Sequence, residues 1–165
     1  MPNFSFDIES TYDKSELNNV FDQAEREMAN RYDFKNTSAD LEWANSDKTA
    51  LKITGDTQFH IDAILDILRK KLALRGQSQK VLDTSGEAIT TNLKTTLNVP
   101  LISGLDKDKA KKITNLVRDF NPKIKVQVQG ESVRVMSPKK DELQTVINLV
   151  KSHEFDFPIV FTNYR

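Results

Sequence analysis

Residues 124–135 read Ile-Lys-Val-Gln-Val-Gln-Gly-Glu-Ser-Val-Arg-Val, and they decide the fold class of this chain. Apolar Ile and Val alternate with polar residues on both sides of Gly130, which is the period-two pattern of two paired strands with a tight turn between them. The apolar positions face a core, so Lys125, Gln127 and Arg134 face outward. We therefore expect an antiparallel hairpin with one polar face.

Helical periodicity flanks this hairpin on both sides. Apolar residues spaced three and four apart predict a helix from Asp106 to Phe120, which stops at Asn121-Pro122. A second helix is predicted after Ser137-Pro138, a capping residue followed by a proline whose missing N–H costs nothing at that position. The hairpin is therefore expected to pack beneath two helices.

The first half of the chain repeats the pattern. A helix is predicted after Asp13, which can cap it with Glu16 as the reciprocal partner. Another is predicted from Asp56 or Thr57 to Arg75. Alternating apolar residues predict the remaining strands, which are expected at residues 4–8, 39–43, 51–53, 80–82, 89–99 and 158–164.

The predicted order is strand–helix–strand–strand–helix–strand, written twice. This order indicates an α+β protein of two tandem ferredoxin-like sandwiches, each an antiparallel sheet with two helices on one face. We expect one domain at residues 1–85 and the other at residues 86–165, with residues 77–88 as a polar linker. If the short strand at residues 80–82 does not form, a strand is exchanged between the domains and the boundary is discontinuous.

Charge is distributed unevenly although the whole chain of 165 residues is neutral. Residues 1–85 carry 11 basic and 15 acidic residues, a net charge of −4, and residues 86–165 carry 13 and 9, a net charge of +4. The basic half indicates an anionic partner, and the alternative is a random division of surface charge between the halves. Cysteine is absent, which excludes disulfides, and no signal peptide or membrane-spanning run is apparent, so a cytoplasmic protein without membrane contact is expected.

The sequence shows no pattern typical of catalysis. His60 and His153 lack metal-ligand partners at useful spacing, and the five glycines form neither a phosphate loop nor a dinucleotide fingerprint. Asp40 and Glu42 lie on one side of a strand, but the nearby Lys52 favours a solvated ion pair over a metal site. We therefore expect no enzyme activity, no metal site and no cofactor.

The outward face of the second sheet is the main candidate for binding. It is expected to join Lys94 with Lys125, Gln127 and Arg134, and to carry no acid except Glu131 in the turn. Lys and Arg contact phosphates, and amides bind base edges or sugars. The expected central strands carry no exposed aromatic residue, which disfavours the RNA-recognition mode that stacks bases on such residues. The alternative is simply the wet face of a sheet.

A second candidate binding segment lies at the end of the first predicted helix, at residues 31–35, Arg-Tyr-Asp-Phe-Lys. Arg31 and Lys35 lie four residues apart, so they face one anion if the helix continues through them. Tyr32 or Phe34 then covers a base. The alternative is a helix end whose aromatic residues close the core, which is favoured for Phe34.

Several segments together resemble the YajQ family. They span the whole chain in family order and comprise residues 2–8, 31–35, 63–76, 110–113, 124–135 and the closing Phe-Thr-Asn-Tyr-Arg of residues 161–165. The chain departs from the usual family pattern at Asn36-Thr37, where Gly-Ser is frequent, and at Ser137-Pro138, where Gly-Lys is common.

The resemblance implies two ferredoxin-like domains in a bacterial cytosolic protein that binds nucleotides and has no enzymatic activity. It also implies cyclic di-GMP, or tRNA and other RNA, as the ligand, and a transcription factor as a further partner. Arg165 joins the candidate binding residues because it closes a matching segment. The competing hypothesis is a protein-interaction module that needs no nucleotide.

Overall fold

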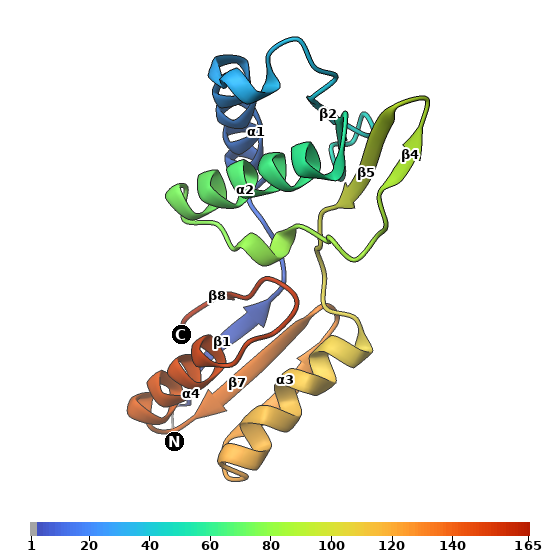
Figure 1. Cartoon of the computed structure of the whole chain (residues 1–165). Helices are drawn as coiled ribbons and strands as arrows, with labels where there is room; N and C mark the ends of the chain where they lie inside the picture. Colours follow the sequence, from blue (N-terminus) through green and yellow to red (C-terminus); the bar gives the residue numbers. More distant parts are fainter. Residues whose placement is uncertain (1–2) are drawn as a thin grey trace. The chain divides into compact units, whose positions relative to one another are not determined.

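The computed structural model describes residues 3–165 and contains two compact units of α+β structure. One unit, which we call the terminal unit, combines the chain up to Thr11 with Ser103–Arg165. The other, which we call the inserted unit, is Tyr12–Ile102. Each unit has a four-stranded antiparallel sheet and two α-helices, so the expected fold class is confirmed (Figure 1).

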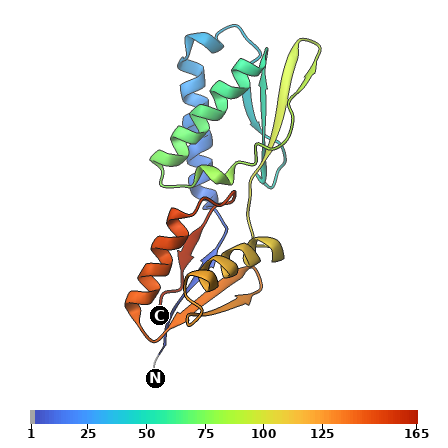
Figure 2. The same cartoon turned by 60° about the horizontal axis from the view of Figure 1, so that its bottom comes forward.

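The terminal unit has the complete ferredoxin-like order of elements. These are β1 (Phe4–Glu9), α3 (Lys107–Phe120), β6 (Lys125–Gln129), β7 (Ser132–Ser137), α4 (Lys140–Ser152) and β8 (Val160–Thr162). The sheet order is β6-β7-β1-β8, in which every neighbouring pair is antiparallel. The helices α3 and α4 cover one face of this sheet, and the other face is open (Figure 2).

The inserted unit reaches an equivalent sheet by a different path. Its elements are α1 (Lys14–Asn30), η1 (Tyr32–Phe34), β2 (Asp40–Trp43), β3 (Ala50–Gly55), α2 (Gln58–Leu74), η2 (Gln79–Val81), β4 (Ile89–Thr91) and β5 (Lys94–Pro100). The sheet order is β2-β3-β5-β4. Strand β5 takes the place beside β3 that β1 takes beside β7 in the terminal unit.

The division of the chain differs from the expected one between residues 85 and 86. Strand β1 pairs with β7 and β8, which lie more than 120 residues further along the chain, and not with β3. The expected strand at residues 80–82 is a 3₁₀ turn, η2, followed by one isolated bridge between Leu82 and Leu101. The reason is that β5 already fills the central position that β1 would need.

The expected single strand at residues 89–99 is a hairpin of β4 and β5. The chain reverses at Asn92 and Leu93, whose φ angles of 51° and 64° are both positive, as in a type I′ turn. Leu93 is 90% exposed and contributes no core contact. The turn was not predicted because it lacks glycine. In addition, the alternating pattern of residues 89–99 runs through Asn92 and Leu93 without a break.

The helix ends follow the sequence with two exceptions. The predicted start of α4 at Ser137-Pro138 is wrong, because Ser137 is still part of β7 and the helix begins at Lys140, with Lys139 as the residue before it. The other exception concerns Glu16. The Asp13 carboxylate accepts hydrogen bonds from the backbone N–H groups of Ser15 and Glu16, at 2.9 and 3.3 Å, and caps α1 as predicted. Glu16 is not the reciprocal partner. Its carboxylate accepts two hydrogen bonds from the Arg75 guanidinium, at 2.7 and 3.0 Å, and so joins the start of α1 to the end of α2.

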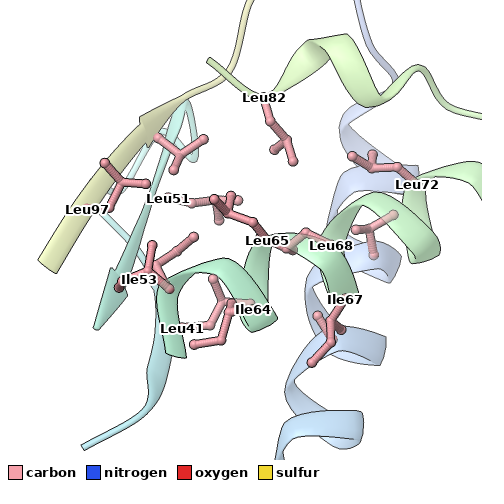
Figure 3. Packing of buried hydrophobic residues seen from close by; sticks show 14 of the residues in the cluster. Leu41, Leu51, Ile53, Ile64, Leu65, Ile67, Leu68, Leu72, Leu82 and Leu97 are labelled. Atoms are coloured by element: carbon pink, nitrogen blue, oxygen red, sulfur yellow. The ribbon is translucent and has the colours of Figure 1, made fainter. Parts of the chain in front are cut away.

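Each unit has its own apolar core. In the inserted unit, leucine and isoleucine from α2 pack against β3 and β5, and α1 closes the other side (Figure 3). Ile53, Ile61, Ile64 and Leu72 are completely buried there. In the terminal unit the completely buried side chains include Phe6 and Ile8 of β1, which face the helices.

Candidate functional site

The open face of the terminal unit's sheet brings together four of the residues singled out from the sequence. Gln127 on β6 lies opposite Arg134 on β7, and Arg134 lies opposite Asp7 on β1. Directly opposed residues of antiparallel strands share a face. These three side chains therefore form one row across the sheet, which Thr162 of β8 completes.

The next row of the same face holds two more cations. Lys125 lies opposite Met136, and Met136 lies opposite Ser5. Beyond Ser5 the row ends at Arg165, because the backbones of Ser5 and Arg165 exchange two hydrogen bonds of 3.2 and 2.9 Å. Both Lys125 and Arg165 are exposed, and neither forms an ion pair among residues 3–165.

A bulge near the end of the chain brings Arg165 onto this face. Thr162 lies opposite Asp7 and Arg165 lies opposite Ser5, so Asn163 and Tyr164 together stand opposite the single residue between them. Asn163 has a φ of 54°, the left-handed conformation that asparagine tolerates better than most residues. Without the extra residue, Tyr164 would take the place of Arg165 opposite Ser5.

A buried ion pair fixes the centre of the face. The Arg134 guanidinium donates to both Asp7 oxygens, from Nε to Oδ1 at 2.9 Å and from Nη2 to Oδ2 at 3.4 Å, and the Asn163 amide donates to Oδ2 at 2.9 Å. The Asp7 side chain is only 5% exposed. The hydrogen bond from Arg134 lowers the pKa of Asp7 against the opposing effect of burial, and Asn163 and Arg165 lower this pKa further.

The expectation that Glu131 is the only acid of this face is therefore wrong. Asp7 and Glu9 both lie on it, because β1 belongs to this sheet. Their inclusion also reduces the charge asymmetry. The terminal unit has 12 basic and 10 acidic residues and the inserted unit has 12 and 14, net charges of +2 and −2.

Lys94 does not belong to this face. It lies on β5 of the inserted unit, opposite Thr91, so the single surface expected from Lys94, Lys125 and Arg134 does not form within one sheet. Lys94 is exposed and contributes a small electrostatic share to the lowered pKa of Asp56, which results mainly from hydrogen bonds donated by Ser38.

Arg31 and Lys35 line one pocket of about 250 Å³ in the inserted unit. They are not on a continuous helix, because α1 ends at Asn30 and the 3₁₀ turn η1 follows. The Arg31 guanidinium donates to both Asp33 oxygens, at 3.0 and 2.7 Å, and lies 5.0 Å from the centre of the Phe34 ring. Arg31 is therefore largely committed to contacts within the protein.

Apolar and acidic residues also line the same pocket. Phe34 is 7% exposed and closes the core, as the sequence favoured, whereas Tyr32 is 89% exposed and does not line the pocket. Glu25 and Asp40 line it beside the two cations. Burial raises the pKa of Glu25, and the neighbouring acids Asp22 and Asp40 raise it further. These two acids offset the positive charges of Arg31 and Lys35 in the pocket.

The site reasoning from sequence missed Asp7 and Asn163. Asp7 stands at an outward position of its strand, but its partner could be named only if β1 was known to pair with β7. The described residues hold no cluster of three or more His, Asp or Glu arranged for a metal ion. Within the same range, no helix is long and apolar enough to cross a membrane.

Comparison with known proteins gives consistent matches along the whole chain. The family model described as nucleotide-binding protein YajQ-like matches residues 4–165. Proteins named nucleotide-binding protein from Nocardioides sp. and Nocardia farcinica are 42% and 40% identical over 166 residues, covering 100% of both chains in each case. A nucleotide-binding protein of Streptomyces coelicolor is 39% identical over the same span. The chain therefore belongs to the family described as nucleotide-binding protein YajQ-like.

Proposed function

We propose that this chain is a non-catalytic nucleotide-binding protein and that its ligand lies on the open face of the terminal unit's sheet. The observation that carries the proposal is the placement of Lys125 and Arg165, two exposed cations without ion-pair partners among residues 3–165, at the two ends of one row. The names of the relatives support a nucleotide as the class of ligand.

The spacing of the two cations favours a ligand with more than one phosphate. Lys125 lies on β6 and Arg165 lies in line with β8, three strand spacings away, which is roughly 14 Å between backbones. Long side chains from both ends can converge on phosphates that are separated by a sugar or a base. A dinucleotide such as cyclic di-GMP, or a short single-stranded RNA, fits this spacing better than a mononucleotide.

The residues between the cations suit the rest of such a ligand. Met136 and Ser5 lie between them in the row, and both are half-buried, so they offer a shallow surface of one thioether and one hydroxyl. Gln127 is exposed in the adjoining row and can bind a base edge or a sugar hydroxyl. Arg134 is half-buried and already bound to Asp7, so its role is to support the face more than to bind phosphate.

The test is calorimetric titration of the full chain with cyclic di-GMP, GTP, ATP and a short single-stranded RNA. The variant Lys125→Ala/Arg165→Ala is expected to lose at least tenfold in affinity, about 1.4 kcal/mol. Arg134→Ala is unsuitable as a test because it leaves the buried Asp7 carboxylate without its ion-pair partner. Binding that contacts two phosphates is expected to weaken roughly sevenfold between about 50 and 200 mM salt.

Two matched variants locate the site. Lys111→Ala/Lys112→Ala removes the same charge from exposed positions of α3 on the helical layer of the same unit, and its affinity is expected to equal that of the wild type. Lys35→Ala/Lys94→Ala tests the candidates in the inserted unit. If only this last variant loses affinity, the open face is the wrong site. If none of the ligands binds, a protein-interaction module replaces the nucleotide proposal.

A further inference from the structure

A second polar pocket lies at one end of the terminal unit's sheet. The end of β1, the start of β7 and the segment before α3 meet there (Figure 1). The pocket has a volume of about 260 Å³, and all its lining residues belong to the terminal unit: Glu9, Ser10, Thr11, Ser103, Gly104, Glu131 and Ser132. None of the residues that we propose to bind phosphate lines it.

The lining consists of oxygen donors without a compensating cation. Glu9 and Glu131 supply two carboxylates, and four further residues of the lining carry hydroxyls. No lysine or arginine lines the pocket, and neither glutamate forms an ion pair among residues 3–165. Two carboxylates that share a pocket repel each other unless a positive charge lies between them.

Ser10 adds a buried hydroxyl without a protein partner to the lining of this pocket. The residue is only 2% exposed, and its hydroxyl Oγ has no hydrogen-bond partner in the part of the chain that the structure describes. It is the one buried side-chain oxygen or nitrogen of residues 3–165 in this condition. A buried hydroxyl without a partner costs about 1–3 kcal/mol, so such groups are nearly always satisfied by a ligand or by water.

The Glu131 carboxylate lies close to the backbone of Gly104. A Cβ atom on Gly104 would lie 3.1 Å from Oε1 and 3.6 Å from Oε2 of Glu131, so the whole carboxylate rests against the Gly104 backbone. The Gly104 N–H donates to the Ser10 carbonyl at 2.6 Å, which joins this contact to Ser10. Gly104 has a φ of 91°, which other residues rarely adopt. The close approach of Glu131 to residue 104 therefore depends on glycine at this position.

We propose that this pocket binds one hard divalent cation, Ca²⁺ or Mg²⁺, through the carboxylates of Glu9 and Glu131 and the hydroxyl of Ser10. Carboxylate, hydroxyl and carbonyl oxygens are the ligands that these ions select. Water alone would satisfy the Ser10 hydroxyl but would leave both carboxylates uncompensated. A divalent cation satisfies all three groups together.

The test is calorimetric titration of the full chain, first treated with a chelator, with CaCl₂ and separately with MgCl₂ in the absence of any nucleotide. One saturating ion per chain is expected at millimolar concentration or below, and the ion that binds more tightly identifies the natural occupant. The amide resonances of Ser10 and Gly104 are expected to shift during the same titration, which locates the ion.

Three variants decide whether the proposed ligands hold the ion. Glu131→Gln and Glu9→Gln are each expected to weaken binding about tenfold or more, and Ser10→Ala by a smaller factor. Glu154→Gln removes an exposed carboxylate outside the pocket in the same unit and is expected to leave the affinity unchanged. No binding of either ion, or equal affinities for wild type, Glu131→Gln and Ser10→Ala, overturns the proposal. Because nucleotide is absent, failure of this titration leaves the proposed function untouched.

Discussion

The two units have the same sheet order but place an acid differently on the open face. In the terminal unit this acid is Asp7 on the central strand β1, and its side chain is 5% exposed. Its negative charge is stabilised by Arg134, Asn163 and Arg165. In the inserted unit we compare it with Glu42, an acid on the same side of the edge strand β2 as Asp40. Glu42 lies 3.6 Å from Lys52, and both of these side chains are about half exposed. The strand that corresponds to β1 there carries Asn98 opposite Lys52.

This difference shows that an open sheet face is not uniformly solvated. A carboxylate on an edge strand remains hydrated in the folded protein, so its ion pair adds little to stability. The Asp7 carboxylate in the middle of a central strand is covered by its neighbours, so its partners become structural. The terminal unit therefore depends on Asp7 and Arg134 in a way that the inserted unit does not depend on Glu42 and Lys52.

The largest effect is expected from Phe6→Ala, which tests to which unit β1 belongs. Phe6 is completely buried, and its ring lies 5.8 Å from that of Phe161, so its loss is expected to cost about 3–5 kcal/mol. Hydrogen exchange is the measurement. Amides of α3, β7 and α4 are expected to lose protection, while those of α1 and α2 keep it.

The matched variant is Ile61→Ala, which removes a completely buried side chain of α2. It is expected to deprotect α1, β3 and β5 and to spare the terminal unit. If Phe6→Ala instead deprotects α1 and α2, β1 belongs with the first 85 residues, as the sequence suggested, and the division into a terminal and an inserted unit fails.

The second effect is the pH dependence that Asp7 contributes. Its pKa is lowered in the folded state, so its stabilisation is present above the unfolded pKa of about 3.9 and is lost as the pH falls through the folded value. Asp7→Asn is therefore expected to be less stable than the wild type at pH 7, and the difference is expected to shrink below about pH 4. Urea unfolding at a series of pH values measures it.

Glu42→Gln is the control from the inserted unit. Its ion pair with Lys52 is long and half exposed, so the substitution is expected to change stability by less than about 1 kcal/mol at every pH. Equal pH profiles for Asp7→Asn and Glu42→Gln would remove the distinction between central and edge acids.

The smallest effects concern the hairpin turns of the two units. Leu93→Gly in the β4–β5 turn relieves a left-handed leucine that is 90% exposed, and it is expected to stabilise the inserted unit by about 0.5 kcal/mol. Gly130→Ala in the β6–β7 turn meets no atom within 4 Å but imposes a φ of 60° on alanine, and it is expected to cost about 1 kcal/mol. Thermal unfolding measures the stability change of both variants. If both changes had the same sign, the left-handed conformation would not explain them.

The sequence predicted most elements but not which strands are neighbours. The four helices and the β6–β7 hairpin were confirmed, because their periodicity and end signals are local. The partners of β1 were missed because alternation gives the face of each residue and not the identity of the neighbouring strand. The β4–β5 turn was missed because Asn92-Leu93 lacks the glycine that typically marks such a reversal.

The candidate site was predicted only in part, because the sequence did not show which strands are neighbours. Lys125, Gln127 and Arg134 share a face because they belong to one hairpin, and that much follows from alternation. Asp7, Asn163 and Arg165 reach this face only through strand partners and a bulge near the end of the chain. Lys94 was assigned to it in error, because residues 86–99 were placed in the second domain, whereas β5 belongs to the sheet of the inserted unit.

The insertion of one unit into the other also sets the order in which the chain can fold during synthesis. The inserted unit is complete once Ile102 has been made, whereas β1 has no partner until Ser132–Ser137 and Val160–Thr162 follow. At about 5–20 residues per second, the apolar side chains of Phe6 and Ile8 wait roughly 6–25 s for β7. In the last part of that interval, after Ile102 has been made, the newly made chain presents an unpaired apolar strand ahead of a folded domain. This is the form that a ribosome-associated chaperone would meet.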